Sequence, residues 1–259
     1  HSQSSCFIIS QIIAQVFTSL GDFYTNMQDT VCYTVIISGK QMDSVNTAAV
    51  LSRKEFFRKD YFSMKAYQRL LSYVKISTPS NEESASSPSS QCQFDLARLL
   101  VEELKDLGIS DVYLDEHCYV YAHLPATKGL EHCKALGFIA HMDTVSDFCD
   151  HAVTPVVTED YDGRELPLGT SGRTLSPEMF PHLASLAGRT LITSDGTTIL
   201  GADDKAGIAE IVTALEHILT KKIPHGPLCV AFTPDEEIGM GPAHFDVKNS
   251  VRIMHIPGR

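Results

Sequence analysis

The sequence predicts an α/β protein with a mixed, mostly parallel central sheet and flanking helices. Two observations support this prediction. Helical and strand-like patterns alternate between Phe94 and Phe232, as expected when helices cover both faces of a sheet. Three apolar runs also end in His, Asp or Glu, and the functional groups of open α/β sheets gather at the carboxyl ends of strands. We therefore expect a functional site at that edge of the sheet.

The first elements lie between Met64 and Leu124. A stripe of apolar residues predicts a helix over 64–75, and a second amphipathic pattern predicts a helix over 94–107. The segment 77–91 between them is rich in Ser, Pro, Asn and Glu, which predicts an exposed loop. Alternating residues over 111–114 and 119–124 predict two short strands that form a hairpin.

The strand-like run Ala135–Ala140 is followed by His141, with Asp143 two residues further on. Strand alternation places both side chains on one side if the strand continues that far. An imidazole can bind a metal through one nitrogen while a carboxylate holds the other ring N–H and fixes the tautomer. An ordinary strand end followed by a polar turn would give the same residues, so both interpretations stay open.

The next acidic pair, Asp203–Asp204, lies in the small-residue segment 201–207. Before it come the long stretch 146–188, predicted as an irregular loop, and the apolar run 190–200. After it, apolar residues recur at helical spacing from 208 to 219. The acids are therefore expected where a strand or hairpin passes into a helix. Taken alone, they are explained as a helix cap, because acids suit a helix N-terminus.

A third apolar run, Leu228–Phe232, precedes three consecutive acids, Asp235, Glu236 and Glu237. Adjacent carboxylates repel each other, so they need a cation, a helix N-terminus or water. One of them could bind a metal while its neighbour acts as a general base, and a solvated loop is the alternative. Together, the three run ends predict a two-metal hydrolase.

The motifs at the three run ends resemble those of peptidase T, a tripeptide aminopeptidase of the dizinc aminoacylase/carboxypeptidase-like superfamily. The resemblance runs from about Met64 to about Val247, and it implies a zinc-exopeptidase-like catalytic domain. Two of its motifs are closer to peptidase T than to the wider superfamily, namely LSPEMFP and IPHG. The motifs are HMDT (141–144), LSPEMFP (175–181), LGADDKAG (200–207), IPHG (223–226) and FTPDEEIG (232–239).

The resemblance implies a role for each of five residues. His141 would bind one zinc ion, and Asp143 would orient its ring. Asp203 would bridge two zinc ions, and the peptide bond that follows it would be cis. Glu236 would be the general base that deprotonates the attacking water, and Glu237 would bind the second zinc ion.

The resemblance is incomplete at both ends. The family needs a further carboxylate ligand after the Glu-Glu pair and a histidine from much further along, so two family ligands are missing here. His255 lies in the divergent tail 248–259, where nothing in the local pattern supports ligation. Each zinc would then keep two protein ligands, whereas catalytic zinc normally has three. We therefore expect the N-terminal part of a catalytic domain in 64–247, truncated and without the lid domain.

The stretch 1–63 does not resemble the family. It is either a natural extension or small interaction module, or sequence outside the natural start, with Met64 as the initiator. We favour the second interpretation, under which the stretch is loosely packed or disordered and nothing pairs with it. The strand-like run Val31–Ser38 is its clearest element.

Composition excludes some classes of function. The net charge is −11 and the sequence pI about 5.4, whereas nucleic-acid binding needs a basic footprint. No apolar run suits a membrane span. Seven cysteines without a C-x-x-C pair indicate reduced thiols in a cytoplasmic chain.

Three functional hypotheses follow. The first is a zinc-dependent tripeptide aminopeptidase that acts on small peptides and is impaired by truncation. The second is a related dipeptidase or amide deacylase, and the third is an inactive fragment with an incomplete metal site. An oligomer is compatible with each.

Overall fold

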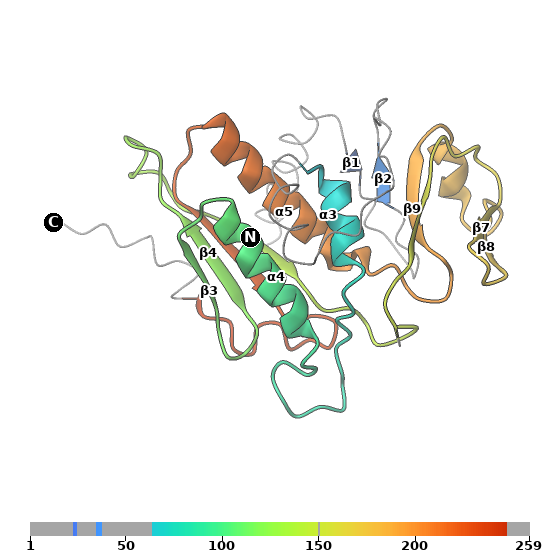
Figure 1. The fold of residues 1–259 in the computed structure, drawn as a ribbon, viewed down its shortest axis with the longest axis horizontal. Coiled ribbons are helices and arrows are strands. Elements are labelled where there is room, and N and C mark those ends of the chain that lie inside the picture. Colours follow the sequence, from blue (N-terminus) through green and yellow to red (C-terminus); the bar gives the residue numbers. More distant parts are fainter. Residues whose placement is uncertain (1–22, 25–34, 38–63, 150, 248–259) are drawn as a thin grey trace, which may run out of the picture. The chain divides into compact units, whose positions relative to one another are not determined.

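The structure is a computed structural model that describes residues 23–24, 35–37, 64–149 and 151–247 (Figure 1). The chain divides into two compact units. One unit comprises 1–49 with 154–200, and the other comprises 50–153 with 201–259. Every site residue predicted from the three motifs belongs to the second unit. His255 and the tail 248–259 lie outside the described residues.

The second unit is built on a four-stranded sheet whose order is β3 (Asp111–Leu114), β4 (Val120–Leu124), β10 (Leu228–Thr233) and β5 (Leu136–His141). The mixed α/β fold and the β3–β4 hairpin are as predicted. The expectation of a mostly parallel sheet is wrong for these strands, because only β5 and β10 pair in parallel. The short connection between β3 and β4 permits only antiparallel pairing, and β10 runs antiparallel to β4.

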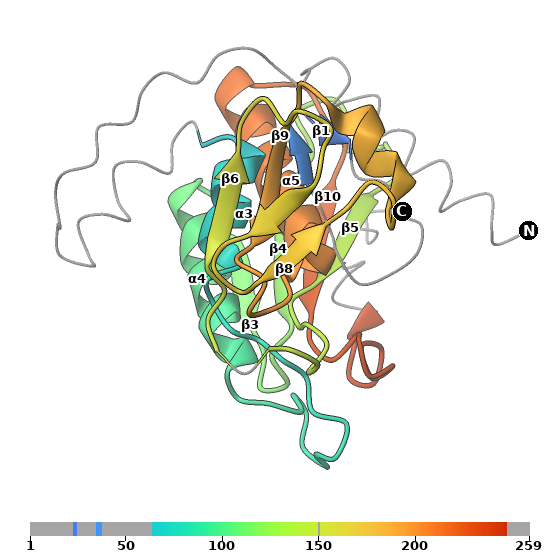
Figure 2. The same ribbon diagram turned by 90° about the vertical axis from the view of Figure 1, so that its right-hand side faces the viewer.

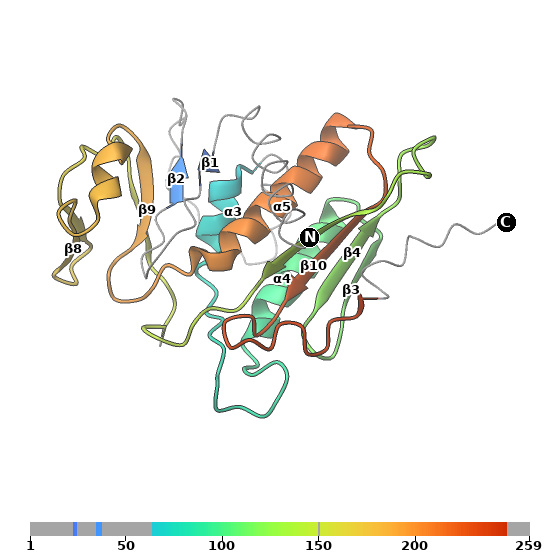
Figure 3. The same ribbon diagram turned by 180° about the vertical axis from the view of Figure 1, so that it is seen from behind.

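Three helices accompany this sheet: α3 (Ala66–Tyr73), α4 (Gln93–Asp106) and α5 (Ala202–Lys221). Helix α4 packs on β3 and β4, whereas α5 packs on β5 and on α3. Figures 1 and 2 show them on one side of the sheet, and Figure 3 shows the strands from the opposite side. Helices on both faces were expected. In the described part of the chain the other face instead carries an aromatic cluster of Tyr119 and Tyr121 with Phe245.

The serine-rich segment 77–91 is only partly the exposed loop that its composition predicts. Its tip is exposed, but Thr78, Ser80 and Ser89 are buried. The Thr78 hydroxyl donates a hydrogen bond to the carbonyl oxygen of Met142 at 2.7 Å, and the Ser80 hydroxyl donates to that of Thr144 at 3.1 Å. Short hydroxyl side chains tolerate burial when their hydrogen bonds are satisfied. These bonds attach the segment to the residues that follow β5.

The first unit contains a second sheet and a small two-stranded sheet. The prediction of an irregular loop over 146–188 is wrong, because this segment contains three strands and a 3-10 helix. Its strands are only three or four residues long, too short to show a clear alternation, and the unit has an apolar core that includes Leu183 and Leu191. The elements are β1 (Phe23–Tyr24), β2 (Val35–Ile37), β6 (Pro155–Thr158), β7 (Leu166–Leu168), β8 (Arg173–Leu175), η1 (Pro181–Leu186) and β9 (Thr190–Ser194).

Strand β2 falls within the run 31–38, for which a strand was predicted. It pairs antiparallel with β1 and with β9. The expectation that nothing pairs with the N-terminal stretch is therefore wrong for these residues. Among the helices of the described ranges, none is long and apolar enough to cross a membrane.

Candidate metal centre

The parallel pair β5–β10 brings the first and third motifs together. His141 is the last residue of β5, and its register partner is Thr233, the last residue of β10. The two strands therefore end at the same edge of the sheet, where β5 leads to Asp143 and β10 leads to Glu236 and Glu237. The N-terminus of α5 supplies the second motif at the same place, as the contact between Asp203 and His141 shows.

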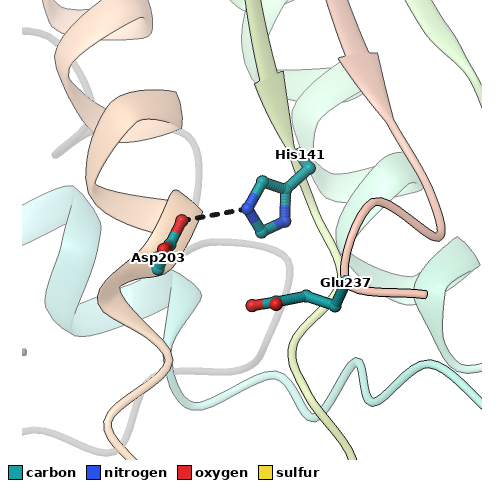
Figure 4. Close-up of side chains that lie close together, drawn as sticks. All are labelled: His141, Asp203 and Glu237. Carbon is teal, nitrogen blue, oxygen red and sulfur yellow. Dashed lines mark hydrogen bonds and ion pairs between the residues drawn. The ribbon is translucent and has the colours of Figure 1, made fainter. Parts of the chain in front are cut away.

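Three side chains from these elements surround one point (Figure 4). Ligand atoms of His141, Asp203 and Glu237 all lie within 4.8 Å of one another. Among these atoms, His141 Nε2 lies 3.0 Å from Asp203 Oδ1. One imidazole nitrogen with two carboxylates is a donor set that zinc accepts, so the residues present fit this metal. The three predicted ligands are thus brought together.

Asp143 makes more contacts than the motif predicted. Its side chain is fully buried, and its Oδ1 lies 3.4 Å from His141 Nδ1. The same carboxylate accepts the backbone N–H of Glu236 at 2.9 Å and that of Glu237 at 3.1 Å. The backbone oxygen of Asp143 also lies 3.0 Å from His141 Nδ1. Asp143 therefore joins the end of β5 to the acidic turn after β10.

Glu236 differs from its neighbour in exposure and contacts. Its side chain is 59% exposed, and its Oε2 lies 3.7 Å from His141 Nε2. The group of possible ligand atoms within 4.8 Å of one another does not include Glu236. A carboxylate beside a candidate metal ligand, open to solvent and outside the ligand set, has the position that a general base needs.

The two acids of the second motif do different things. The Asp203–Asp204 peptide bond is cis, as the resemblance implies. Asp203 faces His141, whereas Asp204 Oδ1 accepts the backbone N–H of Gly207 at 3.2 Å. Asp204 therefore makes the contact that the cap interpretation predicts, while Asp203 lies among the possible metal ligands. A Cβ at position 207 would lie 2.2 Å from Asp204 Oδ1, which explains the glycine there.

Electrostatics at this edge favour a bound cation. Burial alone would lower the pKa of His141, but its contacts with Asp143 and Asp203 raise it to about 11. Burial raises the pKa of Asp204 to about 7, where the charge of Asp203 adds to the effect. The pKa of Glu237 is also raised, chiefly by burial. The neighbouring carboxylates thus favour a protonated His141, and burial favours the protonated forms of Asp204 and Glu237.

Comparisons with known proteins address the resemblance itself. No family model matches the chain. Peptidase T of Bacillus licheniformis is 53% identical over 186 residues, which are 71% of this chain and 45% of the relative. Peptidase T of Alkaliphilus oremlandii is 52% identical over 184 residues, which are 70% of this chain and 45% of the relative. The predicted resemblance is thus confirmed, and the chain spans less than half the length of these relatives.

The chain is also similar to parts of solved structures. Aminopeptidase PepT from Bacillus cereus is 26% identical with a TM-score of 0.48, and the match covers 70% of this chain and 39% of that one. A tripeptidase from Staphylococcus aureus is 25% identical with a TM-score of 0.48, over 71% of this chain and 40% of that one.

Proposed function

We propose that this chain carries the N-terminal part of a zinc-dependent aminopeptidase that releases the N-terminal residue of tripeptides. The observation that supports this most is the convergence of His141, Asp203 and Glu237 within 4.8 Å. It occurs in a chain that is 53% identical to a peptidase T over 186 residues. We propose a small peptide as substrate and the cytoplasm as location.

The proposed metal site takes one zinc ion first. His141, Asp203 and Glu237 would hold it, and three protein ligands are the usual number for a catalytic zinc. The two-zinc arrangement, with Asp203 as the bridge, requires ligands beyond this group. Zinc, when bound, polarises the scissile carbonyl group of the peptide.

The protein's own residues would perform the remaining steps. Glu236 would take a proton from the attacking water and return it to the leaving amine, as its exposed carboxylate permits. Asp143 would hold the ring of His141 and, through two backbone N–H groups, the turn that carries Glu236 and Glu237. One buried carboxylate would therefore position a metal ligand and the base together.

The test begins with zinc content after dialysis and a zinc titration by calorimetry. We expect one zinc per chain, and zinc-dependent hydrolysis of a tripeptide. Glu236→Gln should retain zinc affinity and lose about 100-fold or more in turnover, the usual contribution of a general base. Glu116→Gln, which changes an acid with 89% side-chain exposure, is the matched control. A Glu236→Gln variant as active as the parent would refute the mechanism.

The other two hypotheses are distinguished in the same assay. A dipeptide or an N-acyl amino acid hydrolysed faster than the tripeptide would favour a dipeptidase or amide deacylase. Zinc binding without any hydrolysis would favour the inactive fragment. The match covers 45% of the length of the Bacillus licheniformis relative, and this observation supports the inactive-fragment hypothesis.

A further inference from the structure

Asp235, the first of the three consecutive acids, has a set of contacts of its own. Its side chain is buried, with 2% exposure. Oδ2 accepts the backbone N–H of Ser89 at 2.8 Å, and Oδ1 accepts the Ser89 hydroxyl at 2.5 Å. Oδ1 also accepts Nε2 of Gln93 at 2.7 Å, while the backbone N–H of Asp235 donates to Gln93 Oε1 at 3.3 Å. Asp235 and Gln93 are therefore joined by two reciprocal hydrogen bonds.

These bonds connect the acidic turn to a different element from the one that Asp143 reaches. Gln93 is the first residue of α4 and is fully buried, and Ser89 lies at the buried end of the serine-rich segment. Asp143, by contrast, follows β5 and binds the backbone N–H groups of Glu236 and Glu237. The turn is thus held on one side through its amides and on the other through the Asp235 side chain.

The conformation of Asp235 requires such support. Its φ is +56°, a left-handed conformation that is uncommon for residues other than glycine and persists where the surroundings determine it. The side chain of Glu236 is 59% exposed, so packing does little to fix it. The direction of Glu236 therefore depends on the backbone that Asp235 holds.

We propose that Asp235 and Gln93 form a positioning pair that fixes the Glu236–Glu237 turn at the metal site. The role in catalysis rests on the proposed function, whereas the role in holding the turn does not. A purely structural alternative exists, in which the pair only anchors the start of α4. The two differ in what changes at Glu236 and Glu237 while the protein stays folded.

The first variant is Asp235→Asn in the full chain. The new amide keeps one acceptor, but its NH₂ group must face either the Ser89 N–H or the Gln93 NH₂, which are both donors. We expect faster amide hydrogen exchange over 235–239, measured by mass spectrometry, and a 10- to 100-fold rise in the zinc dissociation constant, as for other residues that support metal ligands. Asp95→Asn, an exposed acid on α4, is the matched control.

The second variant tests the pairing directly. In Asp235→Asn combined with Gln93→Glu, the new amide at 235 donates to the new carboxylate at 93, which also accepts the backbone N–H of residue 235. We expect this double variant to restore exchange and zinc affinity to within about threefold of the parent. If the folded double variant does not recover exchange and zinc affinity, the positioning role of the pair is refuted, even where Asp235→Asn alone does not fold.

The readouts separate this proposal from the proposed function. A parent chain that binds zinc but cleaves no peptide refutes the peptidase activity. The zinc affinities of the variants then test whether Asp235 and Gln93 position the turn. A parent chain that binds no zinc refutes the metal site. Amide hydrogen exchange at Glu236 and Glu237 then tests whether Asp235 and Gln93 position the turn. Asp235→Asn with unchanged exchange at these residues overturns the positioning role, whatever the parent's activity. When turnover is measurable, we expect the loss in kcat and not in KM, because the base is displaced and not the substrate.

Discussion

Two clusters of charged residues in the same unit have opposite compositions. The first, the arginine cluster, joins α3, α4 and α5 through Arg69, Glu103 and Glu216. Arg69 Nε lies 2.7 Å from Glu103 Oε1, and Arg69 Nη2 lies 2.6 Å from Glu216 Oε2. Its Nη1 donates to the backbone oxygen of Met64 and to the Thr213 hydroxyl, so the buried guanidinium bonds through all three of its nitrogens.

The second cluster, the acid site, gathers more carboxylates around a single imidazole. The nearby ammonium of Lys205 donates instead to the backbone oxygen of Ile76 at 2.7 Å, and burial lowers its pKa to about 8. The acid site comprises His141, Asp143, Asp203, Asp204, Glu236 and Glu237.

The difference shows how acids that serve the fold can be told from acids that serve a ligand. Where the chain supplies its own bonded cation, as at Arg69, the cluster is complete and structural. At the acid site the contacts with Asp143 and Asp203 raise the pKa of His141, and burial raises the pKa of Asp204, so several carboxylates share one imidazole as their cation. A metal ion bound among these acids would add positive charge to the cluster and would stabilise the folded chain.

The largest expected effect tests the arginine cluster. Arg69→Met should lower the free energy of unfolding by about 3–5 kcal/mol, because it leaves two buried carboxylates without their cation. Urea unfolding measures it. Arg98→Met removes an exposed ion pair with Asp95 and should cost less than about 1 kcal/mol. Equal effects of the two substitutions would contradict a structural role for Arg69.

A second prediction concerns an acid on α5 that belongs to neither cluster. Burial, with the charge of Asp204 adding to it, raises the pKa of Glu210 from 4.5 to about 7. The folded protein therefore binds the extra proton between these values, and stability is lost as the pH rises through this window. Glu210→Gln should match the metal-free parent near pH 4 and exceed it by up to about 3 kcal/mol above pH 7. A constant difference across this range in urea titrations would contradict the prediction.

A third prediction concerns the acid site with and without metal. At free zinc 100 times its dissociation constant, the free energy of unfolding should rise by about 2.7 kcal/mol, provided zinc binds only the folded chain. Thermal unfolding with zinc or with a chelator measures this difference. His141→Ala should abolish the zinc effect. Undiminished stabilisation of that variant would place the zinc elsewhere.

The smallest expected change in stability comes from Asp203→Asn. This substitution weakens the ion pair with His141 but also relieves repulsion with Asp204 and keeps the shape of the side chain, so the metal-free stability should stay within about 1 kcal/mol of the parent. Zinc affinity should nevertheless fall by at least about tenfold, since a carboxylate ligand is lost. Calorimetry and urea unfolding on the same sample separate the two. A large loss of stability would make Asp203 a structural residue like Glu103.

The motifs were enough to predict which residues meet at the acid site. His141, Asp203 and Glu237 come from three separate run ends, and the resemblance placed all three at one site. Their neighbours were harder to interpret. The contacts of Asp143 with two backbone N–H groups and of Asp235 with Gln93 depend on pairing between distant segments, which no local pattern encodes.

Residues whose burial depends on a distant partner were also missed. A single arginine on an amphipathic helix indicates a solvent-facing position, yet Arg69 is buried because α4 and α5 bring Glu103 and Glu216 to it. The same reason applies to Ser89, whose serine-rich surroundings predicted exposure. The prediction of a mostly parallel sheet failed because β4, the second strand of the hairpin, pairs antiparallel with both β3 and β10.

The parallel pairing of β5 with β10 has a kinetic consequence. Asp143 and Glu236 are separated by 93 residues in sequence and meet only after β10 has been added beside β5. Contacts over such separations form slowly, because the loop must close before any bond compensates for the lost chain entropy. Helix α5, which has local contacts, should therefore form first during refolding. Capture of zinc should lag behind the recovery of helical circular dichroism, and the interval between them would time the closing of the sheet.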